Sequence, residues 1–384
     1  MRNSIGWVCI GTLLFARAAV AADWLTEPSV GVSAEYDDNP FLTTLDHDTR
    51  LRTVLRPALR LKGGTETTVV QTDAWLRFDR YPGQSDANSD NGGVRFDSAW
   101  GSEVQHADLT VDLAQDSTLQ TELLDTGLTQ TAKERRSALI SPSWYYLVTQ
   151  STSVGIDYGY SKVDYASGAQ LTDYRYQTVS ASMAQQLGAT SEWSLAVFGA
   201  GYVTDDDLSR FWNTGLELGL VHDFSERSHG RISAGARHTT SRNEFFSTIF
   251  RDSSNGGVVD AKLEHQFDRA SLHVETSRDV QPSGAGYLQQ SDLLNLGWRY
   301  PFTPQWTVSV DATFYHHKSL TDYRTAYDRH YQTIQPRVEW QWARRWVASG
   351  YARYARSKYA QDPDAATANV VGVQVNYRWS GADL

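Results

Sequence analysis

Hydrophobic and polar positions alternate with a period of two from about residue 29 to residue 379, and no stretch repeats convincingly every 3.6 residues. The clearest alternation occurs at 214–220, 259–264, 306–314 and 371–379. In each segment one face is apolar and the other carries charged residues or glycines, as in an antiparallel strand with two different environments. The pattern predicts an all-β protein, although a soluble sandwich would show the same alternation.

The spacing of the turns separates these two folds. Short turns are predicted near 62–65, 102–103, 150–152, 188–190, 225–228, 268–269, 303–304 and 343–344. Long polar connections are predicted near 37–49, 79–92, 115–134, 162–172, 203–210, 239–255, 280–290, 317–329 and 358–368. Short and long connections alternate, so about 18 strands result, with both termini on the short-turn side. This is typical of a transmembrane antiparallel up-and-down β-barrel with short periplasmic turns, long extracellular loops and periplasmic termini. We therefore expect a protein of the outer membrane of a Gram-negative bacterium, in contact with outer-membrane lipid.

Aromatic residues collect near the predicted strand ends. Those near the short turns are Trp100, Trp144, Tyr146, Trp193, Phe224, Phe267, Trp298, Tyr300, Trp306, Trp340, Trp342, Trp346 and Trp379. Those near the long loops are Phe78, Tyr158, Tyr160, Tyr174, Tyr202, Trp212, Phe314 and Tyr354. We interpret them as two girdles at the two membrane interfaces.

The first segment, 1–22, reads as a secretory signal peptide, with Arg2, an apolar stretch and a small-residue cleavage context at 19–22. Cys9, the single cysteine, lies inside it, so the mature chain would have no disulfide and no thiolate site. Residues 23–384 are predicted to form a single barrel domain.

Composition supports this class of protein. The 384 residues include 13 Trp, 20 Tyr and 13 Phe, and the formal net charge is -10. The negative charge excludes a nucleic-acid binder driven by bulk positive charge. No later apolar run approaches the roughly 20 residues of a membrane-spanning helix. The mean hydropathy of -0.47 fits a barrel with a polar lumen.

The lumen is the candidate site, because about 18 strands enclose a channel unless something fills it. Its predicted pore-lining residues are Arg52, Arg56, Arg60, Asp73, Arg77, Arg95, Asp97, Asp112, Glu217, Arg231, Arg237, Glu264, Arg299 and Asp311. Either these charges pair across neighbouring strands, or the arginine ladder and the inward Tyr145 and Tyr315 guide a polar or anionic polymer. The longest loop, 115–134, either folds inward as a constriction or lies over the mouth.

No motif for catalysis is present: the chain has neither a G-x-S-x-G elbow nor an H-E-x-x-H pair. The acidic runs 37–39 and 205–207 lack the spacing of a calcium loop and read as solvated loops. We expect no enzyme, no cofactor and no metal.

The segment 30–42, with Tyr36-Asp37-Asp38-Asn39-Pro40, resembles the opening of the β-barrel porin 2 superfamily. The segments 141–145 and 171–176 are similar to later parts of it. That superfamily includes barrels encoded in exopolysaccharide operons. The resemblance implies an outer-membrane pore that works with a periplasmic polysaccharide-export protein.

The sequence therefore predicts a pore that exports an exopolysaccharide, with the polysaccharide and the periplasmic export protein as partners. The alternative is a diffusion porin for small solutes or oligosaccharides. A third alternative is an adhesive or structural surface protein that acts through its loops. The oligomeric state, the transported molecule and the direction of transport stay open.

Overall fold

The computed structural model describes residues 23–45, 47–83, 87–122, 132–167, 171–245, 248–320, 328–379 and 382–383. The predicted signal peptide, 1–22, lies outside the described residues. Among the residues described, no helix is long and apolar enough to cross a membrane.

Eighteen long strands form the wall, and a two-residue strand follows them. They are β1 (Asp23–Asp37), β2 (Arg50–Gly64), β3 (Thr68–Arg80), β4 (Ser89–Gly101), β5 (Gln105–Ser117), β6 (Glu134–Thr149), β7 (Thr152–Tyr165), β8 (Tyr174–Gln186), β9 (Ser191–Thr204), β10 (Ser209–Ser225), β11 (Ser228–Phe245), β12 (Thr248–Gln266), β13 (Ser271–Ser283), β14 (Tyr287–Pro301), β15 (Trp306–Ser319), β16 (Arg329–Ala343), β17 (Trp346–Tyr359), β18 (Ala366–Arg378) and β19 (Ala382–Asp383).

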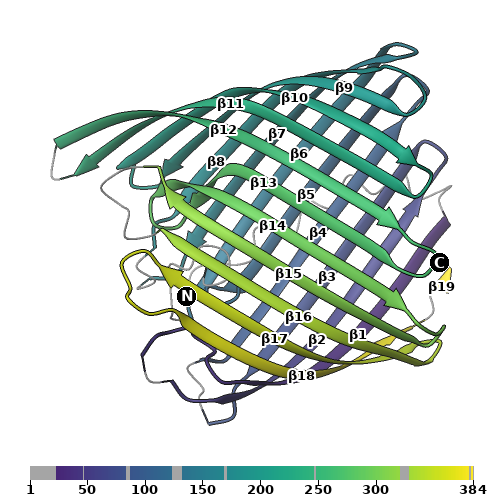
Figure 1. Cartoon of the computed structure of the whole chain (residues 1–384), viewed down its shortest axis with the longest axis vertical. Helices are drawn as coiled ribbons and strands as arrows, with labels where there is room; N and C mark the ends of the chain where they lie inside the picture. Colours follow the sequence, from purple (N-terminus) through teal and green to yellow (C-terminus); the bar gives the residue numbers. More distant parts are fainter. Residues whose placement is uncertain are drawn as a thin grey trace.

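Each long strand pairs antiparallel with the next, and β18 pairs with β1 to close the sheet (Figure 1). The closing register extends from Ser29 opposite Arg378 to Asp37 opposite Val370. The short β19 adds two pairs, at Leu25 and Thr26 of β1. The predicted 18-stranded, all-β antiparallel barrel is confirmed.

The eight connections at one end contain two to four residues each, and β1 begins and β18 ends at that same end. The other end differs from the prediction at three places. Residues 203–210 and 280–290 were expected to be long loops, but the strands there are separated only by 205–208 and 284–286. The expected loop 239–255 is mostly strand, because β11 and β12 continue as a hairpin that projects beyond the wall (Figure 1). Polar side chains do not prevent strand pairing where both faces meet water, and this explains the error.

Alternation along the strands sorts the side chains between the two faces of the wall. On β18, the outward Val371 and Val373 are 63% and 60% exposed, whereas Gly372 between them is buried. The outward leucines of β10, Leu216, Leu218 and Leu220, are also exposed. A wall that is closed and apolar outside requires lipid around it. The protein therefore belongs in the outer membrane of a Gram-negative bacterium.

The girdle at the short-turn end consists of exposed, stacked rings. Trp306 on β15 and Trp340 on β16 stack with ring centroids 5.4 Å apart, and Trp342 stacks with Trp346 at 5.5 Å. At the other end, Tyr158, Trp212 and Tyr354 are exposed on the outside, as predicted.

Tyr174 and Tyr202 were wrongly assigned to the second girdle. Both are buried, and Tyr202 is 0% exposed. They alternate with the outward Arg175 and Val203, so their rings point into the barrel. There they meet residues of β13 and β14 that no local pattern could place beside them.

Two apolar clusters thus lie inside the barrel toward the long-loop end. The first comprises Val163, Tyr174, Tyr202, Phe211, Val280, Tyr287 and Leu288. The second comprises Leu42, Tyr331, Ala355, Ala366 and Ala368, with Leu119 and Tyr315 packed against it. These clusters narrow one end of the lumen.

Candidate functional site: the lumen and its constriction

The residues predicted to line the pore alternate with the outward apolar positions of their strands. On β2, Arg52, Arg56 and Arg60 alternate with Leu55 and Leu59, both of which are exposed on the lipid side. The same alternation places Asp73 and Arg77 on β3, Arg95 and Asp97 on β4, Asp112 on β5, Glu217 on β10, Arg231 and Arg237 on β11, Glu264 on β12, Arg299 on β14 and Asp311 on β15 on the inner face.

Most of these charges form ion pairs within the wall. Arg60 pairs with Asp73 at 2.7 Å, and Arg95 pairs with Asp97 at 2.8 Å. The remaining pairs are Arg77–Asp79 at 2.9 Å, Arg231–Asp260 at 3.0 Å, Lys262–Glu264 at 2.7 Å and Arg299–Glu339 at 3.2 Å. Glu217 accepts a hydrogen bond from Ser233 at 3.2 Å. Pairing is therefore widespread, but of these ion pairs only Arg60–Asp73, Arg231–Asp260 and Arg299–Glu339 join different strands, whereas the other three pairs link residues two apart on one strand.

Arg56 and Arg378 are exceptions. Among the described residues neither side chain forms an ion pair, and both are exposed. They border a recess of about 460 Å³ on the inner side of β1, β2 and β18, which Arg60, Arg95, Asp73 and Asp112 also line. Arg56 lies over the Trp75 ring, with its guanidinium carbon 5.7 Å from the ring centroid. Among the described residues, the carboxylates of Glu27 and Asp112, which also line the recess, form no ion pair either, so two guanidinium groups and two carboxylates face this space.

Asp79, near the long-loop end of β3, is the centre of a buried polar network, and its side chain is 1% exposed. Arg52 and Arg77 donate to its carboxylate at 2.7 and 2.9 Å, and Asn91 donates at 3.2 Å. Gln120 donates at 2.8 Å, although it belongs to the connection between β5 and β6. This contact brings the start of the predicted loop 115–134 to the inner wall.

The neighbouring residues of that connection also face inward. Glu122, 4% exposed, pairs with Arg135 at 3.5 Å and accepts a hydrogen bond from the Tyr165 hydroxyl. Leu119 packs against the second apolar cluster. Of the two alternatives, the described part of the loop adopts the inward one; its residues 123–131 lie outside the described residues.

Tyr81, in the connection between β3 and β4, lies beside this network. Burial raises its pKa, and the nearby Arg52 lowers it by a smaller amount. The guanidinium carbon of Arg52 is 6.0 Å from the Tyr81 ring centroid. The phenol is therefore neutral near pH 7, so Tyr81 contributes no charge to the ion-pair network beside it.

At the long-loop end the β13–β14 hairpin separates from β12 and bends into the lumen, while β14 stays paired with β15 from Gln289 to Pro301. β12 pairs with β13 only from Val259 opposite Arg278 to Gln266 opposite Ser271, whereas β12 pairs with β11 as far as Thr248. Beyond Arg278 the hairpin packs on the inner faces of β7 to β10, and Val280, Tyr287 and Leu288 are each 1–2% exposed.

Hydrogen bonds fix the hairpin tip to the inner wall. The Tyr202 hydroxyl donates to the Ser283 carbonyl at 3.0 Å, and the Thr172 N–H donates to the Gly284 carbonyl at 2.7 Å. Arg237 donates through Nη2 to Oε1 of Gln290 at 3.0 Å. This constriction was not predicted; the available signal was the group of apolar residues Val280, Tyr287 and Leu288 within a stretch expected to be a polar loop.

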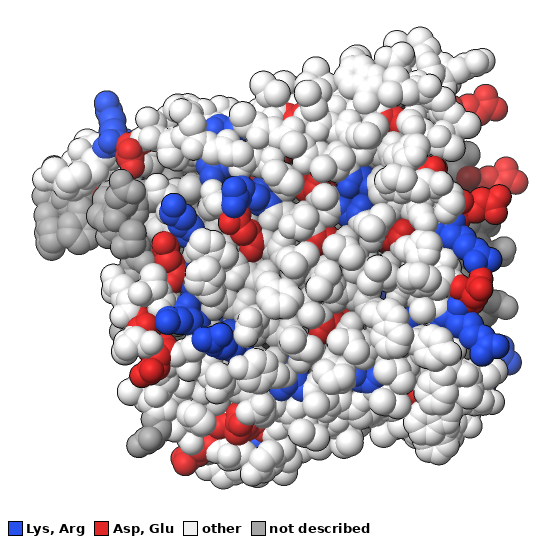
Figure 2. Space-filling view, viewed as in Figure 1, with Lys and Arg blue, Asp and Glu red and all other residues white. Residues whose placement is uncertain are grey.

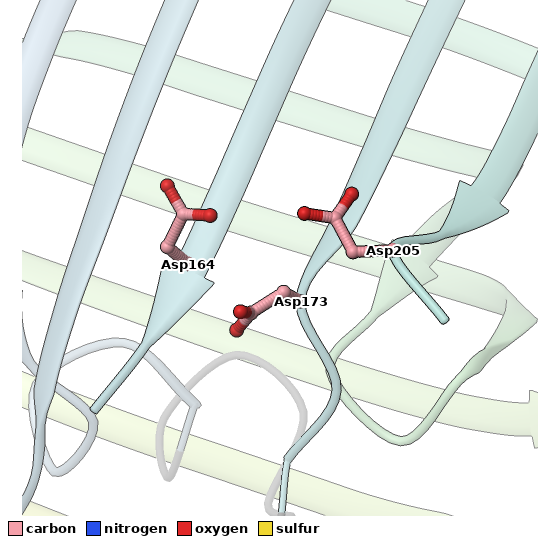
Figure 3. Close-up of side chains that lie close together, drawn as sticks. All are labelled: Asp164, Asp173 and Asp205. Carbon is pink, nitrogen blue, oxygen red and sulfur yellow. The ribbon is translucent and has the colours of Figure 1, made fainter. Parts of the chain in front are cut away.

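Three carboxylates, Asp164, Asp173 and Asp205, meet on the outer rim at the long-loop end (Figure 3). Lys162 pairs with Asp164 at 2.7 Å, and Arg175 pairs with Asp205 at 3.1 Å. Asp173 accepts a hydrogen bond from the Tyr165 N–H at 2.7 Å. The protein's own cations thus balance much of this acidic cluster, and we assign it no function.

No family model matches the chain, so the sequence resemblance to the β-barrel porin 2 superfamily has no support from this comparison. No curated protein matches the chain either.

Solved outer-membrane structures are similar over almost the whole chain. OccK2 (OpdF) of Pseudomonas aeruginosa, crystallised with glucuronate, is 10% identical with a TM-score of 0.48 and covers 93% of this chain and 98% of its own. OccK3 (OpdO) of the same organism is 11% identical with a TM-score of 0.45, covering 92% and 96%. Acinetobacter baumannii OccAB3 is 8% identical with a TM-score of 0.47, covering 93% and 99%. Likeness at this level carries no information about the solute, which must be inferred from the side chains of this barrel.

Proposed function

We propose that this protein is a diffusion porin that passes small polar solutes, with the short turns and both termini in the periplasm. The inward-folded β13–β14 hairpin is the observation that carries the proposal. It is held by buried apolar residues and by hydrogen bonds to the wall, so it is a built-in constriction of the lumen. Such a constriction limits the size of the solute.

The start of the β5–β6 connection reinforces the constriction from another part of the wall. Gln120 is anchored to Asp79, and Leu119 packs against the second apolar cluster. A polysaccharide chain that crosses the barrel would need the part of the lumen that these segments occupy. The constriction therefore favours the porin alternative over exopolysaccharide export.

The pore-lining role of the inward charges is part of this proposal. Most of the arginines are paired with carboxylates, whereas, among the residues described, the exposed Arg56 and Arg378 and the buried Arg237 are not. A solute that passes the recess would meet the two exposed guanidinium groups. We therefore expect these guanidinium groups to interact with anionic groups of a solute, beside the carboxylates of Glu27 and Asp112 in the same recess.

Single-channel recording of the refolded protein in a planar bilayer tests the proposal. The expected result is a steady conductance without any partner, together with liposome swelling rates that decline as the added sugar grows larger. Negligible current that appears only after a periplasmic extract is added would contradict the porin and support a gated exporter.

A pair of variants tests the role of the hairpin. Replacing residues 281–289 by a two-residue Asn-Gly turn should raise the conductance and admit larger sugars. The control shortens the projecting β11–β12 hairpin by removing residues 242–253, which should leave the conductance unchanged. Should the first variant fail to fold, Gln290→Ala offers a milder way to loosen the same hairpin.

A further inference from the structure

A row of polar side chains crosses the outer face of β14 to β17 at the long-loop edge of the apolar belt. The strand register places Asp292 opposite His316, His316 opposite His330, and His330 opposite Lys358. Two positions further along each strand, toward the band of apolar residues that faces lipid, the residues side by side are Leu294, Phe314, Gln332 and Arg356. The next row toward the belt is Leu296, Ala312, Ile334 and Tyr354. The surface thus changes from apolar to basic over three rows.

These rows border an outer recess of about 480 Å³. Its lining combines apolar side chains, Leu294 and Phe314, with the basic side chains of His316, His330, Arg356 and Lys358. The imidazole rings of His316 and His330 stack with centroids 4.2 Å apart and an interplanar angle of 2°. The recess is therefore amphipathic and lies on the side of the wall that faces lipid.

The positive charge of the recess is only partly balanced. Nε and Nη2 of Arg278 donate to the two carboxylate oxygens of Asp292 at 2.6 and 2.9 Å, and Asp292 lies 3.7 Å from His316. Within the part of the chain that the structure describes, neither Arg356 nor Lys358 forms an ion pair, and both are exposed.

Two other outward cations near this edge of the barrel have carboxylate partners. Arg80 pairs with Asp90 at 2.6 Å, and Arg136 pairs with Glu134. Figure 2 shows lysine and arginine side chains spread over the face formed by the later strands, with acidic side chains among them. The recess on β14–β17 thus combines unpaired cations with an apolar floor, unlike these compensated sites.

We propose that this recess binds a phosphorylated glycolipid of the outer leaflet, with lipid phosphate on Arg356, Lys358 and the histidine pair and acyl chain against Leu294 and Phe314. The long-loop end faces the outer leaflet in the orientation proposed above, and phosphates of the lipid headgroups lie at the edge of the apolar belt. Guanidinium and ammonium groups bind phosphate by charge-assisted hydrogen bonds, and basic pockets on membrane proteins bind lipid headgroups in this way. The site is outside the pore, so it does not depend on which solute passes through the barrel.

The test compares the double variant Arg356→Gln, Lys358→Gln with the control Arg80→Gln, Arg136→Gln. The two variants remove the same charge from the same edge of the barrel, but the control removes cations that already have carboxylate partners. Binding of purified diphosphoryl lipid A to the detergent-solubilised barrel is measured by native mass spectrometry, with dephosphorylated lipid A and inorganic phosphate as further ligands. The faster gel migration of unheated barrels reports folding.

We expect the first variant to bind diphosphoryl lipid A at least about tenfold more weakly, and the control to bind within about twofold of the unmodified protein. Dephosphorylated lipid A should bind the unmodified protein as weakly as diphosphoryl lipid A binds the first variant. Equal losses in both variants would overturn the proposal, as would unchanged binding in the first. Displacement of the lipid by inorganic phosphate at equal concentration would show that the recess recognises phosphate alone and would overturn the assignment to a lipid.

Discussion

Gln290 on β14 accepts a hydrogen bond from Arg237 on β11, at 3.0 Å, although β12 and β13 separate these strands in the sheet. The contact exists because the β13–β14 hairpin separates from β12 and bends into the lumen. Arg237 is 4% exposed, and a Cβ atom at Gly256 would lie 2.7 Å from its guanidinium. Glycine at 256 thus leaves the space that lets a buried cation reach the hairpin.

Loss of this contact should loosen the constriction. In Gln290→Ala, Arg237 loses a partner while it stays buried, and leaving such a group unsatisfied costs about 1–3 kcal/mol. We expect larger current fluctuations in single-channel recordings and brief excursions to a higher conductance. The control is Gln332→Ala, on the outer face of β16, which should record like the unmodified barrel; quiet traces from Gln290→Ala would show that the apolar packing alone holds the hairpin.

Asp79 and Asp73 both pair with arginine, but they should contribute very differently to stability. Asp79→Ala leaves Arg52 and Arg77 without their shared buried carboxylate, which should lower the free energy of unfolding by roughly 3–5 kcal/mol. Asp73→Ala removes a pair whose side chains are 49% and 28% exposed, and it should cost under about 1 kcal/mol. Urea unfolding in lipid vesicles, followed by tryptophan fluorescence, measures both. Similar losses in the two variants would mean that the Asp79 network is solvated.

Tyr202 should be a principal anchor of the hairpin. Its ring lies 5.2 Å from that of Tyr174 and 5.8 Å from that of Phe211, and its hydroxyl bonds to Ser283. Tyr202→Phe removes one hydrogen bond, worth about 1 kcal/mol, whereas Tyr202→Ala should cost roughly 3–5 kcal/mol through the cavity it creates. Amide hydrogen exchange at residues 280–290 should accelerate slightly in the first variant and strongly in the second. Protection that survives in Tyr202→Ala would assign the anchoring to other residues.

Arg56 and Arg378 should influence ion selectivity. Neutralising both, as Arg56→Gln with Arg378→Gln, removes the guanidinium groups that are available in the inner recess. In a salt gradient, the reversal potential should move toward cation preference. Arg80→Gln with Arg136→Gln, which removes two charges from the outer surface, serves as the matched control. An unmoved reversal potential in the double variant would remove these arginines from the permeation path.

The fold was predictable because its determinants are local. Alternation of two residues specifies which face a side chain takes, and turn residues mark where each strand ends, so both the strand count and the outward tryptophans such as Trp306 and Trp340 followed from the sequence. Ion pairs such as Arg95–Asp97 are also local, because the two residues lie two positions apart on one strand.

The constriction could not be predicted in this way. It depends on contacts between segments that are distant both in sequence and in the sheet, such as Tyr202 with Ser283 and Gln120 with Asp79. An apolar residue near the long-loop end can face either lipid or an inward-folded hairpin, and its own strand does not reveal which. Tyr174 and Tyr202 were misassigned for this reason.

Closure of the barrel by β1 and β18 has a consequence for biogenesis. Ser29 has no partner on its β18 side until Arg378 has been synthesised, since these residues pair across the seam. Before then every intermediate is an open sheet with two unpaired edges, and such edges recruit other chains. The last strand must also find the first across nearly the whole chain, which is among the slowest kinds of contact to form. The polypeptide should therefore be kept unfolded until it is complete, and a chain that ends before Ala366 should aggregate rather than insert as a smaller pore.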